Sequence, residues 1–257
     1  MNIRALLTTP NDWADLACHY GSYFTRTKLI PWIQAQGYEL HDIQNELCTS
    51  EGFWPLVKEG WSYFKGFGHG NETQFAGYKN KILIEATSDM TPFKETVVHL
   101  LSCSTGAKLG PKFPLTYFGY KDVYYFMAAR TTDPPDGLAE PYFDSDFEYD
   151  RARLSGYTHG KSIEMCKAKY TDWYNKADPY SRKWLLWDRD IAVGYGPLDH
   201  THPGPPPPEI PCYWCPFKTA DKPVLLKHIC LTHCEAPAAC KSWIPAWIRK
   251  ATGCQYT

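Results

Sequence analysis

Ten consecutive residues combine an apolar run with a group of small residues: Val97-Val98-His99-Leu100-Leu101-Ser102-Cys103-Ser104-Thr105-Gly106. The apolar first half of this stretch is typical of a short buried strand, and the small residues from Ser102 onward predict a tight turn. We expect a helix to follow this turn. A strand that ends at a single cysteine before a helix is a common way to present a nucleophile, so Cys103 is the candidate catalytic thiol.

A second stretch repeats this design with histidine in place of cysteine. It reads Tyr63-Phe64-Lys65-Gly66-Phe67-Gly68-His69-Gly70, and the glycines beside His69 leave its ring unobstructed. A thiol is a strong nucleophile only as its thiolate, and histidine can take the proton near neutral pH. We therefore predict that His69 and Cys103 form a base–nucleophile pair, with the backbone N–H groups of Gly70 and Cys103 as the oxyanion hole. His99 is a rival base, although a residue in mid-strand more often points into the sheet.

Strands and helices alternate along most of the chain. In sheets built from repeated βαβ units, ligands bind beyond the carboxyl ends of the strands, which is where His69 and Cys103 fall. The alternation predicts an α/β fold with a mainly parallel sheet that is covered on both faces. We expect strands at residues 3–9, 38–43, 63–69, 82–84, 97–103, 115–120 and 191–196, helices at 21–37, 51–58, 147–177 (in two pieces) and 180–187, and a loop at 131–143.

The composition is that of a folded chain without a strong net charge. Of the 257 residues, 44% are hydrophobic and 16% aromatic, and the formal net charge is −1. These values allow a sizeable core and give no global field that would attract nucleic acid or an anionic membrane. No apolar run approaches the ~20 residues that span a bilayer, so we expect no membrane partner. The N-terminus shows no signal-peptide pattern, which predicts a cytoplasmic protein.

A proline-rich segment separates two parts of the chain. Residues 197–210 include four consecutive prolines, Pro205 to Pro208, which favour an extended and semi-rigid spacer. We therefore predict one domain at residues 1–196, a linker at 197–210, and a small C-terminal domain with its tail at 211–257. Six of the ten cysteines lie in this last segment, and five of them crowd together: Cys212, Cys215, Cys230, Cys234 and Cys240. In a cytoplasmic chain such clustering favours metal binding over disulfides.

The C-terminal segment has the spacing of a zinc finger. Cys212 and Cys215 are followed after twelve residues by His228 and after four more by His233, which predicts a structural zinc held by two cysteines and two histidines. Cys234 is an alternative to His233 as the fourth ligand. The segment from residue 211 onward contains six basic and two acidic residues, so it is only mildly basic. A single finger also buries little surface on a nucleic acid. We therefore favour docking of a protein partner on the finger over nucleic-acid binding.

Three motifs of the chain belong together. They are Gly68-His69-Gly70-Asn71-Glu72, Val98-His99-Leu100-Leu101-Ser102-Cys103-Ser104-Thr105-Gly106-Ala107-Lys108-Leu109-Gly110-Pro111, and Trp184-Leu185-Leu186-Trp187-Asp188-Arg189-Asp190-Ile191-Ala192-Val193. Together they resemble the caspase-like cysteine proteases, and most closely the branch that contains gingipains, clostripain-like enzymes and CHAT-domain proteins. The resemblance covers about residues 1–196 and implies a three-layer α/β/α sandwich. It also implies hydrolysis of protein or peptide substrates through an acyl-enzyme intermediate, with His69 as general base and Cys103 as nucleophile.

The residues that would set substrate preference are less distinct. Arginine-specific relatives often carry an acidic residue two positions before the catalytic cysteine, and here that position is Leu101. Asp12 and Asp15 follow the first strand and would line the substrate pocket, as acids in that region do in some relatives. The same residues are also typical of an ordinary turn and a helix cap. A preference for a basic residue is therefore only one of two interpretations.

The sequence as a whole predicts a cysteine endopeptidase with a zinc finger for recruitment. The resemblance suggests a prokaryotic defence or signalling system as its setting. Two alternatives stay open. One is a non-catalytic caspase-like scaffold, and the other is a zinc-finger binding protein.

Overall fold

The computed structural model describes residues 3–128, 134–203, 210–211 and 218–219. The chain divides into two units, Met1–Pro205 and Pro206–Thr257. In the second unit the described residues form two short antiparallel strands, β10 (Ile210–Pro211) and β11 (Lys218–Thr219). The predicted zinc ligands lie outside the described residues: Cys212, Cys215, His228, His233 and the alternative Cys234.

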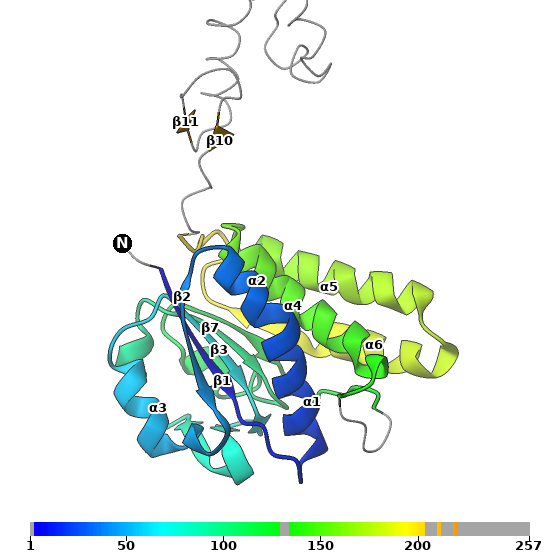
Figure 1. Ribbon diagram of the computed structural model, residues 1–257, viewed down its shortest axis with the longest axis horizontal. Helices are drawn as coiled ribbons and strands as arrows, with labels where there is room; N and C mark the ends of the chain where they lie inside the picture. Colours follow the sequence, from blue (N-terminus) through cyan, green and yellow to red (C-terminus); the bar gives the residue numbers. More distant parts are fainter. Residues whose placement is uncertain (1–2, 129–133, 204–209, 212–217, 220–257) are drawn as a thin grey trace, which may run out of the picture. The chain divides into compact units, whose positions relative to one another are not determined.

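A six-stranded sheet forms the centre of the first unit (Figure 1). Neighbouring strands pair in parallel except for the last two, which are antiparallel, so the predicted mainly parallel sheet is confirmed. The strand predicted at residues 82–84 belongs instead to a separate three-stranded antiparallel sheet of β4 (His69–Gly70), β5 (Gln74–Ala76) and β6 (Ile82–Glu85). The central order is β2 (Glu39–Gln44), β1 (Arg4–Thr9), β3 (Tyr63–Phe67), β7 (Val97–Leu101), β8 (Thr116–Tyr120) and β9 (Ala192–Tyr195).

Each face of the central sheet carries its own hydrophobic core, because successive side chains of a strand point to opposite faces. On one face, Phe64 and Val98 pack with α3 (Ser50–Val57) and the small sheet. On the other, Tyr63 and Val97 pack with α1 (Leu16–Phe24), α4 (Glu140–Leu154) and α5 (His159–Lys176). A last helix, α6 (Pro179–Ile191), leads into β9. The result is the expected three-layer α/β/α arrangement.

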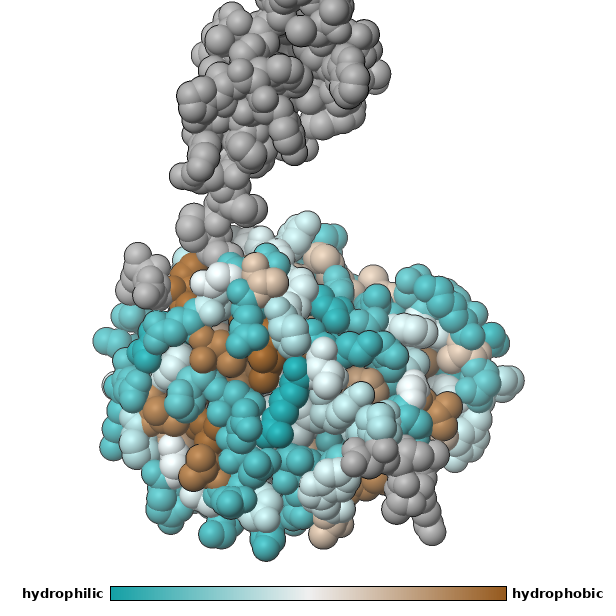
Figure 2. Space-filling model, viewed as in Figure 1, coloured by the Kyte–Doolittle hydropathy of each residue, from teal (hydrophilic) through white to brown (hydrophobic). Residues whose placement is uncertain are grey.

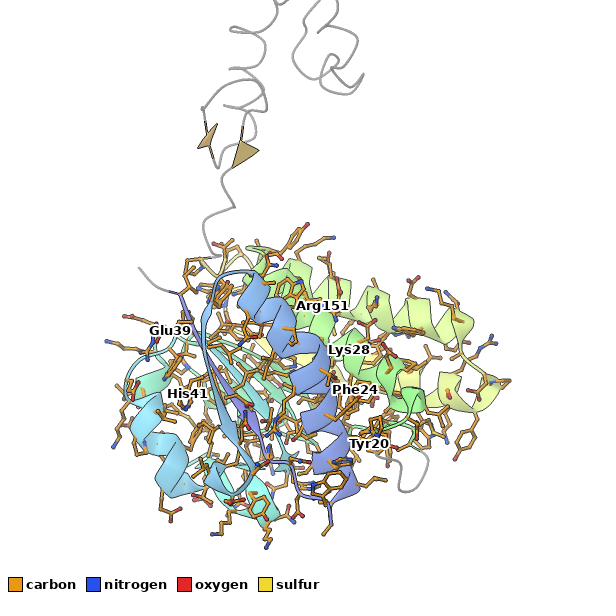
Figure 3. The ribbon with its side chains drawn as sticks, viewed as in Figure 1. Tyr20, Phe24, Lys28, Glu39, His41 and Arg151 are labelled. Atoms are coloured by element: carbon orange, nitrogen blue, oxygen red, sulfur yellow. The ribbon has the colours of Figure 1, made fainter. Side chains whose placement is uncertain are left out.

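Helix α1 and its continuation pack along α4. Tyr20, Phe24 and Lys28 follow one another at one-turn intervals on the side that faces α4 (Figure 3). The ring of Phe24 stacks on Phe143 with 5.1 Å between centroids, and Lys28 Nζ lies 3.0 Å from a carboxylate oxygen of Glu140. The face of this unit that is seen in Figure 2 is mostly hydrophilic, with hydrophobic residues in small groups. Within the described ranges, no helix has both the length and the apolar content needed to cross a membrane.

Several helix boundaries differ from those predicted. The first helix begins at Leu16 because the Asp15 side chain accepts the N–H groups of its first turn, and it passes through a π-helical turn (Thr25–Leu29) into α2 (Ile30–Ala35). Pro31 lies in the first turn of α2, directly after the π-helical turn. Helix α4 begins at Glu140, so the predicted loop at 131–143 ends earlier.

The prediction of a helix directly after Cys103 is wrong. Residues 103–109 form consecutive turns, and a short 3-10 helix follows at Gly110–Lys112. The reason lies in the hydrogen bonds of the turn. Ser104 N–H donates to Asp122 O at 2.9 Å and Gly106 N–H donates to Tyr120 O at 2.8 Å, so these groups bond to the end of β8 and the residues after it and not along a helix.

Four charged side chains are fully buried between the sheet and α4. Lys65 Nζ lies 2.5 Å from Asp146 Oδ2 and 3.3 Å from Asp150 Oδ2. His99 Nε2 lies 2.9 Å from Asp146 Oδ1, and His99 Nδ1 lies 2.6 Å from Asp150 Oδ1. Lys65 Nζ also lies 3.0 Å from both ring nitrogens of His99, so the lysine ammonium contacts the three other members of this buried cluster and offsets the negative charge of the carboxylates. His99 thus points into the core with both nitrogens bound, as a mid-strand residue is expected to do.

Candidate active site

The carboxyl ends of two neighbouring parallel strands place His69 and Cys103 at the same edge of the sheet. Strands β3 and β7 pair up to Phe67 and Leu101, and each candidate residue lies two positions beyond the end of its strand. Gly68 N–H donates to Leu101 O at 3.4 Å, so the pairing extends one step beyond the strands. Adjacent strands lie about 4.8 Å apart. The backbones that carry the two residues therefore run side by side.

Gly70 allows this close approach. A Cβ atom at Gly70 would lie 2.0 Å from Ser102 Oγ and 2.8 Å from Cys103 O, distances that no side chain tolerates. The hairpin that begins at His69 therefore rests directly on the turn that carries Cys103. Further along, Lys108 N–H and Leu109 N–H donate to Glu72 O at 3.2 and 2.8 Å, which ties the two loops together a second time. Gly70 and Glu72 of the first motif thus have structural roles.

Cys103 is the accessible thiol of the first unit. It is half-buried, whereas Cys18, Cys48 and Cys166 are buried. Its Sγ lies 3.9 Å from Tyr124 O, in the extended segment that follows β8. Burial raises the pKa of the Cys103 thiol above its ordinary value. In this conformation the thiol is protonated at neutral pH, so it needs a base to become a nucleophile.

The backbone is strained directly after the thiol. Ser104 has a φ of 58°, in the left-handed region that residues with side chains rarely adopt. The hydrogen bond from its N–H to Asp122 O holds it there. Such strain is stored where the surrounding structure fixes it, and it occurs often at active sites. The turn is therefore oriented by the segment beyond β8.

Helix α6 holds that segment in place. Trp187 Nε1–H donates to Val123 O at 2.8 Å, and Asp188 Oδ1 accepts the N–H of Tyr125 at 3.0 Å. Asp188 is fully buried, and burial raises the pKa of its carboxyl well above the ordinary value. Both residues belong to the third sequence motif. Their role in positioning the chain beside Cys103 was missed in the sequence, because it depends on how α6 packs.

His69 is paired with Asp15. The ring Nε2 forms a close contact with Asp15 Oδ2, and the Asp15 side chain also accepts the N–H groups of Ala17 and Cys18 at the start of α1. The hydrogen bond to Asp15 raises the pKa of His69, and the same bond lowers the pKa of Asp15. With Nε2–H donating to a carboxylate, the lone pair of the neutral ring is at Nδ1. Asp15 therefore fixes the tautomer that leaves Nδ1 free to accept a proton.

The other predicted site residues fall at the same edge. Asp12 Oδ1 accepts the N–H of Ala14 at 3.0 Å, which is a turn contact. Asp15 is a helix cap, as one interpretation had it, and its contact with His69 could not be foreseen from the cap pattern. The pocket role of both acids and the oxyanion hole at Gly70 and Cys103 stay predictions. Among the described residues no hydrogen bond joins His69 to Cys103, and such bonds often form only when substrate is bound.

Solved structures of similar fold come from cysteine proteases. The complex of the pro- and mature domains of Porphyromonas gingivalis RgpB aligns with a TM-score of 0.51 and 10% identity over 76% of this chain and 47% of that chain. The Arg-specific cysteine proteinase gingipain R aligns with a TM-score of 0.50 and 11% identity over 76% and 46%. Caspase-1 from Spodoptera frugiperda gives a TM-score of 0.47 and 10% identity over 76% and 88%.

These similarities define the class of fold. The chain has the caspase-like α/β fold that the gingipain structures share, as predicted. It spans about half the length of the gingipain chains, and at such low identity the likeness shows the fold alone. No family model matches the chain, and no curated protein matches it.

Proposed function

We propose that this protein is a cysteine peptidase that cleaves protein or peptide substrates through Cys103 and His69. The observation that carries the proposal is the position of Cys103. It is the accessible thiol among the described cysteines, in a strained turn at a strand end, beside the hairpin that begins with His69. The caspase-like fold of gingipain R, described as an Arg-specific cysteine proteinase, supports the same class.

The proposed reaction begins with proton transfer from the Cys103 thiol to His69 Nδ1. As the proton leaves, Sγ attacks the carbonyl carbon of the scissile peptide bond and a tetrahedral oxyanion forms. The N–H groups of Cys103 and Gly70 would stabilise this charge. The His69 imidazolium then donates its proton to the leaving amine, and water hydrolyses the remaining thioester. Asp15 stabilises the charged ring throughout.

Thiol labelling tests whether Cys103 is activated or merely exposed. In the folded full-length chain, iodoacetamide is expected to alkylate Cys103 before Cys18, Cys48 and Cys166, and His69→Ala is expected to slow this reaction at neutral pH. Mass spectrometry of the digested protein measures both, and buried Cys166 serves as the internal reference. A Cys103 that reacts equally fast with and without His69 would instead indicate the non-catalytic scaffold.

Asp15→Asn is expected to shift the acid limb of the pH profile of kcat/KM to lower pH. Only the neutral His69 ring can accept the thiol proton, so activity rises as pH increases through the His69 pKa. The carboxylate raises that pKa, and removing its charge lowers it. Asparagine still caps α1, which preserves the fold.

The control for this experiment is Asp12→Asn, because Asp12 contacts its own turn and not His69. It should leave the acid limb in place. If Asp15 instead lines the substrate pocket, Asp15→Asn will raise KM for substrates with a basic residue and leave the pH profile unchanged. The two roles therefore give different results.

For the C-terminal segment, we propose one structural zinc bound by Cys212, Cys215, His228 and His233. The support is the ligand spacing in the sequence. The finger would recruit a protein partner, and we do not favour nucleic acid as its ligand. The cytoplasmic location is likewise a proposal.

A further inference from the structure

A third potential metal ligand lies beside the Asp15–His69 pair. One ligand atom each from Asp15, Cys18 and His69 lies within 4.8 Å of the other two. The Asp15 and His69 side chains are 25% and 37% exposed, while Cys18 is 1% exposed. Two ligands therefore face the solvent side and one comes from the protein interior. The partly exposed Asp15 and His69 side chains are the ones that an ion from solution would meet first.

Local structure explains why these side chains converge. Asp15 is the cap of α1 and Cys18 lies three positions later, so both project from the same side of the first helical turn. The β4 hairpin brings His69 to them from across the sheet edge. Thiolate, imidazole and carboxylate are the three ligand types that Zn²⁺ uses, at bond lengths of about 2.0–2.3 Å. Ligand atoms within 4.8 Å of one another need only small side-chain adjustments to reach one ion.

The other cluster of this kind in the described chain does not suit a metal. His99, Asp146 and Asp150 are equally close together, but Lys65 Nζ lies 2.5 Å from Asp146 and already supplies the positive charge. At Asp15, Cys18 and His69 no cationic side chain is paired with the carboxylate other than His69 itself, among the residues that the structure describes.

We propose that Asp15, Cys18 and His69 form an inhibitory site for a divalent transition metal such as Zn²⁺. This inference rests on the proposed role of His69 as general base. On binding, the Cys18 thiol releases its proton to solvent and a metal–sulfur bond forms. The metal takes the His69 Nε2 lone pair, and the remaining ring proton resides on Nδ1. The ring then has no lone pair left to accept the Cys103 proton.

The three-ligand set leaves a fourth position on the metal for water. Metal binding would remove the hydrogen bond between Asp15 and His69 and would place a proton on His69 Nδ1. Both changes affect the general base, and the turn that carries Cys103 would stay intact. The metal would thus hold the enzyme inactive without unfolding it.

Cobalt binding tests the site without depending on activity. Full-length protein with Cys212→Ser and Cys215→Ser, which removes two tail thiols, is titrated with Co²⁺. We expect thiolate-to-cobalt absorption in this background and in its Cys103→Ala and Cys166→Ala derivatives. We expect its loss in the Cys18→Ala derivative. An unchanged spectrum in Cys18→Ala would overturn the proposal, and so would loss of the band in Cys103→Ala, which would assign the metal to Cys103 and His69.

Inhibition by Zn²⁺ provides the functional measurement on the same proteins. Zn²⁺ is expected to abolish peptide cleavage reversibly, with recovery on adding a chelator. Cys18→Ala should keep its metal-free activity and need about tenfold or more Zn²⁺ for half inhibition. Equal Zn²⁺ sensitivity in Cys18→Ala would contradict the site. If no variant cleaves peptides at all, the proposed peptidase function fails, and the cobalt spectra still decide the metal site.

Discussion

His69→Ala is expected to lower kcat/KM for peptide cleavage by about 10²–10⁴-fold, the usual contribution of a general acid–base group. The reason is the protonated state of Cys103, since burial raises the pKa of this thiol. Without a base, the thiolate is rare at neutral pH. The loss should be smaller at high pH, where hydroxide in solution removes the thiol proton.

The matched control is His41→Ala. His41 is an exposed histidine on β2, labelled in Figure 3, and lies on a strand that is not adjacent to β3 or β7. This change should leave kcat/KM and the thermal midpoint at wild-type values. Full activity in His69→Ala, with the fold retained, would remove His69 from the mechanism.

Asp146→Asn is expected to lower the free energy of unfolding by about 3–5 kcal/mol, the range for breaking a buried ion pair on one side. The carboxylate contacts Lys65 and His99 in a site with no solvent exposure. Burial alone would raise the pKa of Asp146, but the charges of His99 and Lys65 outweigh it and hold that pKa below its ordinary value. The amide cannot balance these charges.

Urea unfolding followed by circular dichroism measures this loss, and Asp144→Asn on the same helix is the control. Asp144 pairs with Arg151 and Lys169 at 2.8 and 3.0 Å, but its side chain is 21% exposed. Partly exposed pairs contribute about 1 kcal/mol or less. Equal losses in the two variants would show that the buried charges are not a central stabilising feature.

The buried charges also have a pH signature. A carboxyl whose pKa is depressed in the folded state stabilises the fold above its unfolded pKa, and this contribution is lost as pH falls through the folded value. The contribution of Asp146 should therefore persist through neutral pH. It should decline only in strong acid.

The sequence was sufficient to predict the central strands and the edge at which the candidate residues meet. Apolar runs such as Val97–Leu101 are buried on both faces of the sheet and leave little choice of structure. The carboxyl ends of parallel strands then locate His69 and Cys103 without any knowledge of side-chain contacts. This part of the prediction rests on local pattern alone.

Other features depend on elements that are distant in sequence. The contact of Asp15 with His69 joins residues 54 positions apart, and the pairing of Lys65 with Asp146 joins residues 81 positions apart. A cap motif explains why Asp15 begins a helix, but not which ring its second oxygen meets. In the sequence, Lys65 and His99 only interrupt apolar strands. Their partners are carboxylates of α4, which the sequence pattern does not identify. The prediction of a helix after Cys103 was wrong for the same reason. The N–H groups of Ser104 and Gly106 bond to the end of β8 and the residues after it, which are distant in sequence.

In the proposed peptidase, the geometry of the site corresponds to a resting state. The thiol is protonated beside the segment that follows β8, and the base is oriented by Asp15. Substrate would have to bring Cys103 and His69 Nδ1 into hydrogen-bond contact. Because the two backbones already run side by side, we expect this contact to form without a change of fold.

The decisive experiment for the peptidase assignment is cleavage of a peptide library by the purified 257-residue protein, with the Cys103→Ala variant in parallel. We expect cleavage products with the wild-type protein and none with Cys103→Ala, although both have the same circular dichroism spectrum. Products that appear equally with both proteins, or with neither at any peptide in the library, would contradict the assignment of this chain as a cysteine peptidase.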